Sequence, residues 1–320
     1  MNKKSFILLL FIVFAVSTYA QQGIVLSQPY MSSQFLSPAS VGNGNYEQRI
    51  QSNLKSQFLD GNNLYRTLVS GWDSRFKNAD PEQKNYFGVG AQVISDQVMA
   101  GLINSNYITL DFAYHLKLNN PNHRLSMGVK VGGNHTRIDL NSLELDDQND
   151  PSFNVDNIGK FMPNYGFGLY YYTTKWYLGV SSPQLVNYDF NSSQRHYFIR
   201  AGAVLKITDN LKIRPSSFLK FTKNAASTLD LTGLLIFRDE TWAGFAFRAP
   251  VGIFVPTGSS GGGYAFLVGL NLSDQLSVGY SFGYSVGNQT FKFNNGSHEI
   301  TLRYDHIYES KKIIKSPRYF

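Results

Sequence analysis

The chain has 320 residues, of which 16% are charged and 15% aromatic, with 28 glycines, a formal net charge of +7 and no cysteine. This length is enough for a large core or one large closed sheet. Many aromatics and glycines with few charges favour a protein that presents apolar surface to a medium other than water. The cysteine count excludes disulfides, thiol catalysis and cysteine metal sites. The positive charges form no basic stripe, so we expect no nucleic-acid partner.

Residues 1–20 have the three parts of a secretory signal peptide. Lys3 and Lys4 form a basic start, an apolar run covers 6–16, and Ala20 ends a small-residue cleavage site. A membrane anchor is the alternative, but the run is too short to span a bilayer. We therefore predict export through a cleaved signal peptide, with Gln21 as the first mature residue. No cysteine follows the cleavage site, which excludes a lipoprotein anchor.

The mature sequence is built from segments in which apolar and polar residues alternate. In residues 108–118, Ile108, Leu110 and Phe112 alternate with Thr109 and Asp111. We count roughly fourteen such segments, the first near 46–58 and the last near 298–307. Clear examples between them are 125–131, 165–171, 197–207, 211–221 and 276–284. Many are about ten residues long, the length that a tilted strand needs to cross a bilayer.

Along the second half of the chain, the links between these segments alternate between two sizes. Tight polar turns are expected at 173–175, 208–210, 238–240 and 273–275, and longer links at 138–163, 182–195, 250–263 and 287–297. Outer-membrane barrels alternate short periplasmic turns with long external loops, and their sheets close because backbone groups in hydrocarbon must pair. We predict an all-β, transmembrane antiparallel outer-membrane β-barrel of about 14 strands over residues 46–308, in a Gram-negative outer membrane. A secreted propeller or sandwich is the alternative, but no blade-length repeat is present.

Two segments flank the predicted barrel. Residues 21–45 are expected to form an N-terminal periplasmic segment, and residues 309–320 a basic periplasmic tail. An even number of strands places both on the same side of the membrane. We predict that four cations of the tail contact a periplasmic partner: Lys311, Lys312, Lys315 and Arg318. A frayed tail without a partner is the alternative.

No motif indicates catalysis. The six histidines have no metal-ligand spacing, the serines lie in no nucleophile elbow, and the glycines of 258–263 lack the lysine of a phosphate loop. We therefore expect no catalytic, cofactor or metal site and no enzyme activity. A calcium site in the loop 144–156 is an alternative, but the EF-hand order is absent and a solvated or protein-contact loop is favoured. Its aspartates are Asp146, Asp147, Asp150 and Asp156.

Five cations in two adjacent segments occupy the alternate positions that are predicted to face the lumen. They are Arg200, Lys206, Lys212, Arg214 and Lys220. Such a set is able to attract anions into a pore. The interpretation that we prefer is pairing with inward carboxylates such as Asp230, Glu299 and Asp305.

Several blocks in a fixed order resemble a known family. They begin with "SQPYMSSQFLSPASVG" (27–42) and "FGVGAQVISDQVMAG" (87–101), and "PNYGFGLYYYTTKWYLGVSSPQL" (163–185) is the most specific. The later blocks are "RHYF" (195–198), "RPSSFLKF" (214–221), "WAGFAFR" (242–248) and "HEITLRY" (298–304). Together they resemble the PorP/SprF family of Bacteroidetes outer-membrane proteins. Ser37 stands where the family usually has Asn, and the Trp usual near the first strand is missing from 48–58.

The resemblance implies a non-enzymatic accessory barrel of the type IX secretion and gliding machinery. Members support export or surface anchoring of particular large surface proteins, often adhesins. The implied partners are outer-membrane lipid, a peptidoglycan-binding lipoprotein and the periplasmic ring, and the exported client. A passive outer-membrane pore or small-solute transporter is the second hypothesis, and an outer-membrane enzyme a third, disfavoured one.

Overall fold

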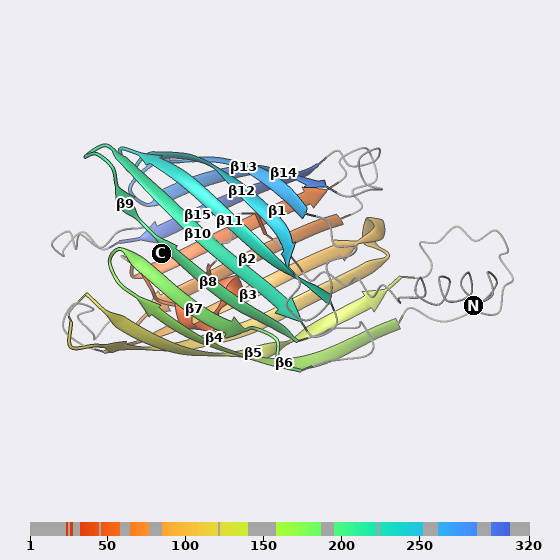
Figure 1. Cartoon of the computed structure of the whole chain (residues 1–320). Helices are drawn as coiled ribbons and strands as arrows, with labels where there is room; N and C mark the ends of the chain where they lie inside the picture. The colour runs from red at the N-terminus through yellow and green to blue at the C-terminus, as the bar shows by residue number, and fades with distance from the viewer. Residues whose placement is uncertain are drawn as a thin grey trace, which may run out of the picture.

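The computed structural model describes residues 24, 26–27, 33–44, 46–57, 65–76, 85–120, 122–139, 158–186, 195–222, 225–251, 262–286 and 296–307. These residues form one antiparallel sheet whose tilted strands close into a barrel (Figure 1). The predicted signal peptide, the aspartate loop 144–156 and the basic tail 309–320 lie outside the described residues. Among the described residues, no helix has both the length and the apolar character needed to cross a membrane.

The strands follow one another around the barrel in chain order. Their bounds are β1 Gln48–Gln57, β2 Tyr65–Arg75, β3 Tyr86–Val98, β4 Ile103–Lys117, β5 Arg124–Ile138, β6 Ile158–Tyr172, β7 Trp176–Ser182, β8 His196–Ala203, β9 Leu205–Lys206, β10 Leu211–Thr222, β11 Ala225–Phe237, β12 Thr241–Val251, β13 Gly262–Asn271, β14 Leu276–Val286 and β15 Ser297–His306. Because β8 and β9 are two pieces of one segment that both pair with β10, the barrel has 14 strands. The predicted fold class is confirmed.

The first and last strands close the barrel. β1 pairs with β15 over its full length, from Gln48 opposite His306 to Gln57 opposite Ser297. β1 therefore begins, and β15 ends, at the same end of the barrel, which we call the turn end. It carries the tight turns at 173–175, 207–210, 238–240 and 272–275. The links from β2 to β3 and from β4 to β5 lie at this end too, and the opposite end, which we call the loop end, carries the remaining connections.

The loop end is less regular than the sequence predicts. β6 already begins at Ile158, so part of the expected link 138–163 is strand. The connection between β10 and β11 spans only residues 223–224, and β3 joins β4 through the short 3-10 helix η2 (Met99–Gly101). The link between β10 and β11 is therefore an exception to the alternation of short turns and long loops that is expected in the second half of the chain.

The alternating pattern of residues 108–118 separates outside from inside. On β4, Ile108 is 65% exposed and Phe112 is 47% exposed, although both are large and apolar. Between them, Asp111 is fully buried and points into the barrel, as does His115 two rows further on. Apolar side chains outside and polar side chains inside are the reverse of a soluble sandwich, and they place hydrocarbon against the outer face.

Candidate functional site: an occupied barrel lumen

The barrel interior is occupied by a segment that precedes β1. Residues 33–44, here called the strap, contain helix α2 (Ser33–Leu36) and the 3-10 helix η1 (Pro38–Ser40). Ala39 and Val41 have no exposed surface, and η1 contacts β4, β5 and β6. In Figure 1 the strap is the red segment within the ring of strands. Residues 21–45 are predicted to form a periplasmic segment, whereas residues 33–44 of this range lie inside the barrel.

Inward-facing glycines make room for the strap. A Cβ at Gly128 would collide with the backbone of Pro38 and Ala39, and one at Gly88 with the carbonyl of Val41. Added Cβ atoms at three further wall glycines would collide with Gln34 or Ser37; these glycines are Gly71, Gly90 and Gly168. Because only glycine lets the two backbones approach this closely, the wall of β2, β3, β5 and β6 is shaped to hold this segment.

Wall side chains hold the strap through its main chain. The hydroxyl of Ser181 on β7 donates to the carbonyl of Leu36 at 2.7 Å. The Nε2 of His115 on β4 lies 2.8 Å from the carbonyl oxygen of Val41. Further contacts are Lys130 Nζ to Gln34 O at 3.4 Å, Gly42 N to Asp73 Oδ2 at 2.8 Å, and Arg75 to Gly44 O. These bonds satisfy backbone groups that would otherwise be buried without partners.

One strap side chain joins a buried charged network. Gln34 is 1% exposed, and its Nε2 donates to Asp111 Oδ2 at 2.8 Å. Lys130 lies 3.5 Å from the other oxygen of Asp111 and also donates to Gln92 at 3.3 Å. Removing Gln34 would leave part of a buried carboxylate without its hydrogen bond, so this network ties the strap to β3, β4 and β5.

A second network ties the end of the strap to the turn end. The Tyr46 hydroxyl donates to Asp73, which also accepts from Gly42 N, and the Arg49 guanidinium lies 3.7 Å from the centre of the Tyr46 ring. Burial raises the pKa of Tyr46 well above its ordinary value, so the phenol is neutral and remains a donor.

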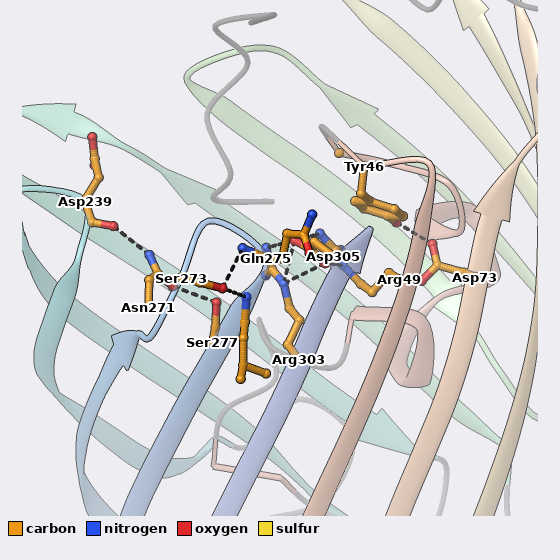
Figure 2. Close-up of polar contacts among 12 residues, drawn as sticks. Tyr46, Arg49, Asp73, Asp239, Asn271, Ser273, Gln275, Ser277, Arg303 and Asp305 are labelled. Atoms are coloured by element: carbon orange, nitrogen blue, oxygen red, sulfur yellow. Dashed lines mark hydrogen bonds and ion pairs between the residues drawn. The ribbon is translucent and has the colours of Figure 1, made fainter. Parts of the chain in front are cut away.

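The closing seam carries two ion pairs on one carboxylate. Asp305 on β15 accepts from Arg49 on β1 at 2.7 Å and from Arg303 at 2.8 Å, and all three side chains are nearly buried (Figure 2). Bidentate arginine–carboxylate contacts of this kind fix geometry as well as adding energy. They hold β15 in register with β1, where the sheet closes.

The five predicted lumen cations have different surroundings. Arg200, Arg214 and Lys220 are buried, and the Arg200 guanidinium lies 4.6 Å from the ring centre of Tyr170. Lys206 is exposed and pairs with Asp209 in a turn, where that ammonium lowers the pKa of the Asp209 carboxyl. Lys212 pairs with the carboxylate of Asp239 at 2.7 Å, also at the turn end.

The three inward carboxylates have partners outside that set of five. Asp230 accepts from Arg248 at 2.7 and 2.6 Å. Glu299 accepts from Asn53 at 2.7 Å and from the backbone N–H of Ser27 at 2.6 Å. Asp305 is held at the seam by arginines of β1 and β15. The predicted contact residues of the tail, Lys311 to Arg318, lie outside the described residues.

The sequence pattern does not predict the strap. Its position depends on glycines at 71, 88, 90, 128 and 168, which recur at inward positions of four strands, and on polar residues opposite them. An inward glycine predicts empty space as readily as an occupied lumen, so the pattern alone did not indicate a plug. Among the described residues, no cluster of three or more potential metal ligands is found.

A closed barrel with an apolar exterior and an occupied, polar interior defines the chain as a β-barrel membrane protein. Its similarity to known proteins shows to which family of membrane proteins it belongs. Residues 18–304 match the family described as type IX secretion system membrane protein PorP/SprF, and the chain belongs to this family, whose barrel lies in the outer membrane. No curated protein matches the chain.

Two solved structures align with most of the chain. The Ralstonia pickettii toluene transporter TbuX aligns with a TM-score of 0.53 at 8% identity, over 87% of this chain and 94% of that chain. The KdgM porin aligns with a TM-score of 0.38 at 12% identity, over 80% of this chain and 98% of that chain. At such identities the TbuX similarity shows the barrel fold alone.

Proposed function

We propose that the protein is a non-enzymatic accessory barrel of the type IX secretion machinery that supports export or surface anchoring of particular large surface proteins. Family membership gives the secretion context. The observation that carries the accessory role is the strap, because a lumen filled by the chain's own residues favours a scaffold over a free passage. The export role needs only a rigid body that presents surfaces to partners on both sides.

The proposed orientation places the turn end in the periplasm and the loop end at the cell surface. The loop end then presents surfaces to the client, and the turn end faces the lipoprotein and ring components. We propose that Lys311, Lys312, Lys315 and Arg318 of the tail bind such a periplasmic partner. Truncation after Ile307 tests this: barrel assembly should persist while secretion falls. Unchanged secretion would refute the docking role of the tail.

The decisive experiment is deletion of the gene, followed by comparison of the proteins at the cell surface and in the medium. We expect one or a few large exported proteins to be lost while the remaining surface proteins are unchanged. Complementation with the full gene is the control. The mature N-terminus, determined on the purified protein, should be Gln21 if the signal peptide is cleaved as proposed.

A passive pore is the second candidate, favoured by the buried cations Arg200, Arg214 and Lys220. Cations lining a passage would bias it toward anions. Recording from the full mature protein in a planar bilayer separates the two proposals. A stable, solute-sized conductance would favour the pore, and the absence of conductance would favour the scaffold.

A further inference from the structure

A row of polar side chains crosses the outer face of the barrel at the loop end. Arg66 on β2 lies opposite Gln97 on β3, which in turn lies opposite Asn104 on β4. Asn104 lies opposite Arg137 on β5. These four residues, here called the polar row, share the outward alternate positions of their strands. Three strand spacings of about 4.8 Å separate the two arginines by about 14 Å.

The polar row lies beyond the edge of the apolar band. Ile108 is the apolar residue nearest to the loop end on the outer face of β4, and it is 65% exposed. Asn104 is four positions further along this strand. That is about 13 Å along the strand, or about 10 Å along the membrane normal at a strand tilt of about 40°. The polar row therefore lies at the level of lipid headgroups, whereas Ile108 lies at the level of lipid chains.

The charge of this outer face is positive. The outward positions of β1 to β5, which are described in full, hold no carboxylate, and their two arginines both lie at the loop end. Asp139 follows β5 and lies 3.4 Å from Arg137, in an exposed ion pair. Across the neighbouring strands, Arg66 lies opposite Ser56 and Gln97 instead. Because one arginine already has a carboxylate beside it, an anion is attracted most strongly to the Arg66 end of the row.

Amide side chains continue the row from Arg66. Gln97 is exposed, and Asn104 donates its amide N–H to the carbonyl of Gly101, which leaves the Asn104 side-chain oxygen as an acceptor. Amides offer both donors and acceptors, as the hydroxyls of a sugar require. Below the row, Ile108 and Leu110 present exposed apolar surface to lipid chains. Phosphate, sugar and acyl chain thus each have a matching part of this face.

We propose that the polar row binds the headgroup of a phosphorylated glycolipid of the outer leaflet. The phosphate lies beside Arg66, the sugar lies along Gln97 and Asn104, and the acyl chains lie against the apolar residues of β4. A phospholipid supplies the phosphate without the sugar hydroxyls, so it fits the row less well. This inference goes beyond the secretion role and rests on the proposed orientation, which places the loop end at the cell surface.

The test measures lipid binding to the full mature protein in a neutral maltoside detergent, by native mass spectrometry. Monophosphoryl lipid A, phosphatidylglycerol and phosphatidylethanolamine are titrated separately. We expect lipid A to bind most tightly, because it adds sugar hydroxyls to the phosphate, and phosphatidylethanolamine to bind most weakly, because it has no net charge. Any other order of affinity would overturn the proposal. This comparison needs no variant, so it remains decisive if a substitution impairs folding.

Substitutions locate the site. Arg66→Gln should weaken the binding of lipid A and of phosphatidylglycerol about fivefold each, the factor expected for one arginine beside anionic lipid. Gln97→Leu should weaken lipid A binding several-fold and leave phosphatidylglycerol binding unchanged, because only the sugar loses a hydrogen bond. Arg238→Gln is the matched control, since Arg238 is exposed in the turn between β11 and β12 at the turn end. It should bind all three lipids as the parent does.

Unchanged lipid A binding by Arg66→Gln, or an equal loss in Arg238→Gln, would refute the site. Lipid binding in detergent depends neither on the orientation in the membrane nor on secretion. Failure of this test therefore leaves the proposed secretion role standing, and an unchanged set of surface proteins after gene deletion would leave the lipid site standing.

Discussion

The fit between Gly128 and the strap makes a sharp prediction. In Gly128→Val, the new Cβ would meet the backbone nitrogen of Ala39 and the carbonyl carbon of Pro38. These are backbone atoms, so no side-chain rotation relieves the collision. Overpacking of this kind costs about 1–3 kcal/mol. We expect the cost to fall on strap docking, because β5 is fixed on both edges by β4 and β6.

The size of the effect follows from what holds the strap. Five main-chain hydrogen bonds from the wall, to Gln34, Leu36, Val41, Gly42 and Gly44, contribute on the order of 1 kcal/mol each. The strap therefore stays docked in the parent, and Gly128→Val should not eject it fully. A loss of about 1–3 kcal/mol should increase the released fraction roughly 5- to 150-fold.

Because the chain has no cysteine, the released fraction of the strap can be measured with one introduced thiol. Ser40 is 3% exposed, so a thiol in Ser40→Cys reacts with a soluble maleimide only when the strap opens. The labelling rate of Ser40→Cys should rise by the stated factor when Gly128→Val is added. The control is Gly233→Val, since a Cβ at Gly233 has nothing within 4 Å. Equal labelling rates in the two double variants would refute the role of Gly128 in seating the strap.

Three further results are expected. Deletion of 33–44 should give a barrel that conducts ions in a planar bilayer where the full mature protein does not; a silent deletion variant would show that other residues obstruct the lumen. Asp305→Leu should lower the stability of the folded barrel by about 3–5 kcal/mol, because it removes the carboxylate that two buried arginines share. Lys206→Met should leave the stability unchanged. Heat-dependent gel mobility measures both variants, and equal mobility shifts would contradict the seam assignment. Leu110→Arg should lower the stability of the barrel folded into lipid vesicles by about 2–4 kcal/mol, because Leu110 lies in the apolar band. Asn106→Arg should lower it by only about 0–1 kcal/mol, because Asn106 lies near the edge of this band. Equal effects of the two substitutions in urea titrations would contradict the lipid-facing assignment of β4.

Much of the barrel follows from local pattern. The period-two alternation of residues 108–118 predicts which side chains face outward, and Ile108 and Phe112 are exposed as that pattern requires. The tight turns at 173–175 and 238–240 lie between the strands that the alternation predicts. The start of strand β6 does not follow from the local pattern, because Pro163 and the glycines near it also suit a loop.

The candidate site depends on contacts that are remote in sequence. Ser181 binds Leu36 across 145 positions, and Glu299 binds Ser27 across 272. In neither pair does the local sequence around one residue predict its partner. The alternating pattern predicts that Arg200 and Lys220 face the lumen. Which residues surround them depends on the segment that fills the barrel.

The sequence by itself determined a closed sheet of alternating strands in the outer membrane, because side-chain parity and turn spacing are local properties that the bilayer makes decisive. Only the tertiary structure decided that residues 33–44 lie within the lumen. The physical reason is that a glycine such as Gly128 shows in the sequence only that a side chain is missing. The assembled barrel is needed to show that the backbone of Pro38 and Ala39 occupies the space beside it.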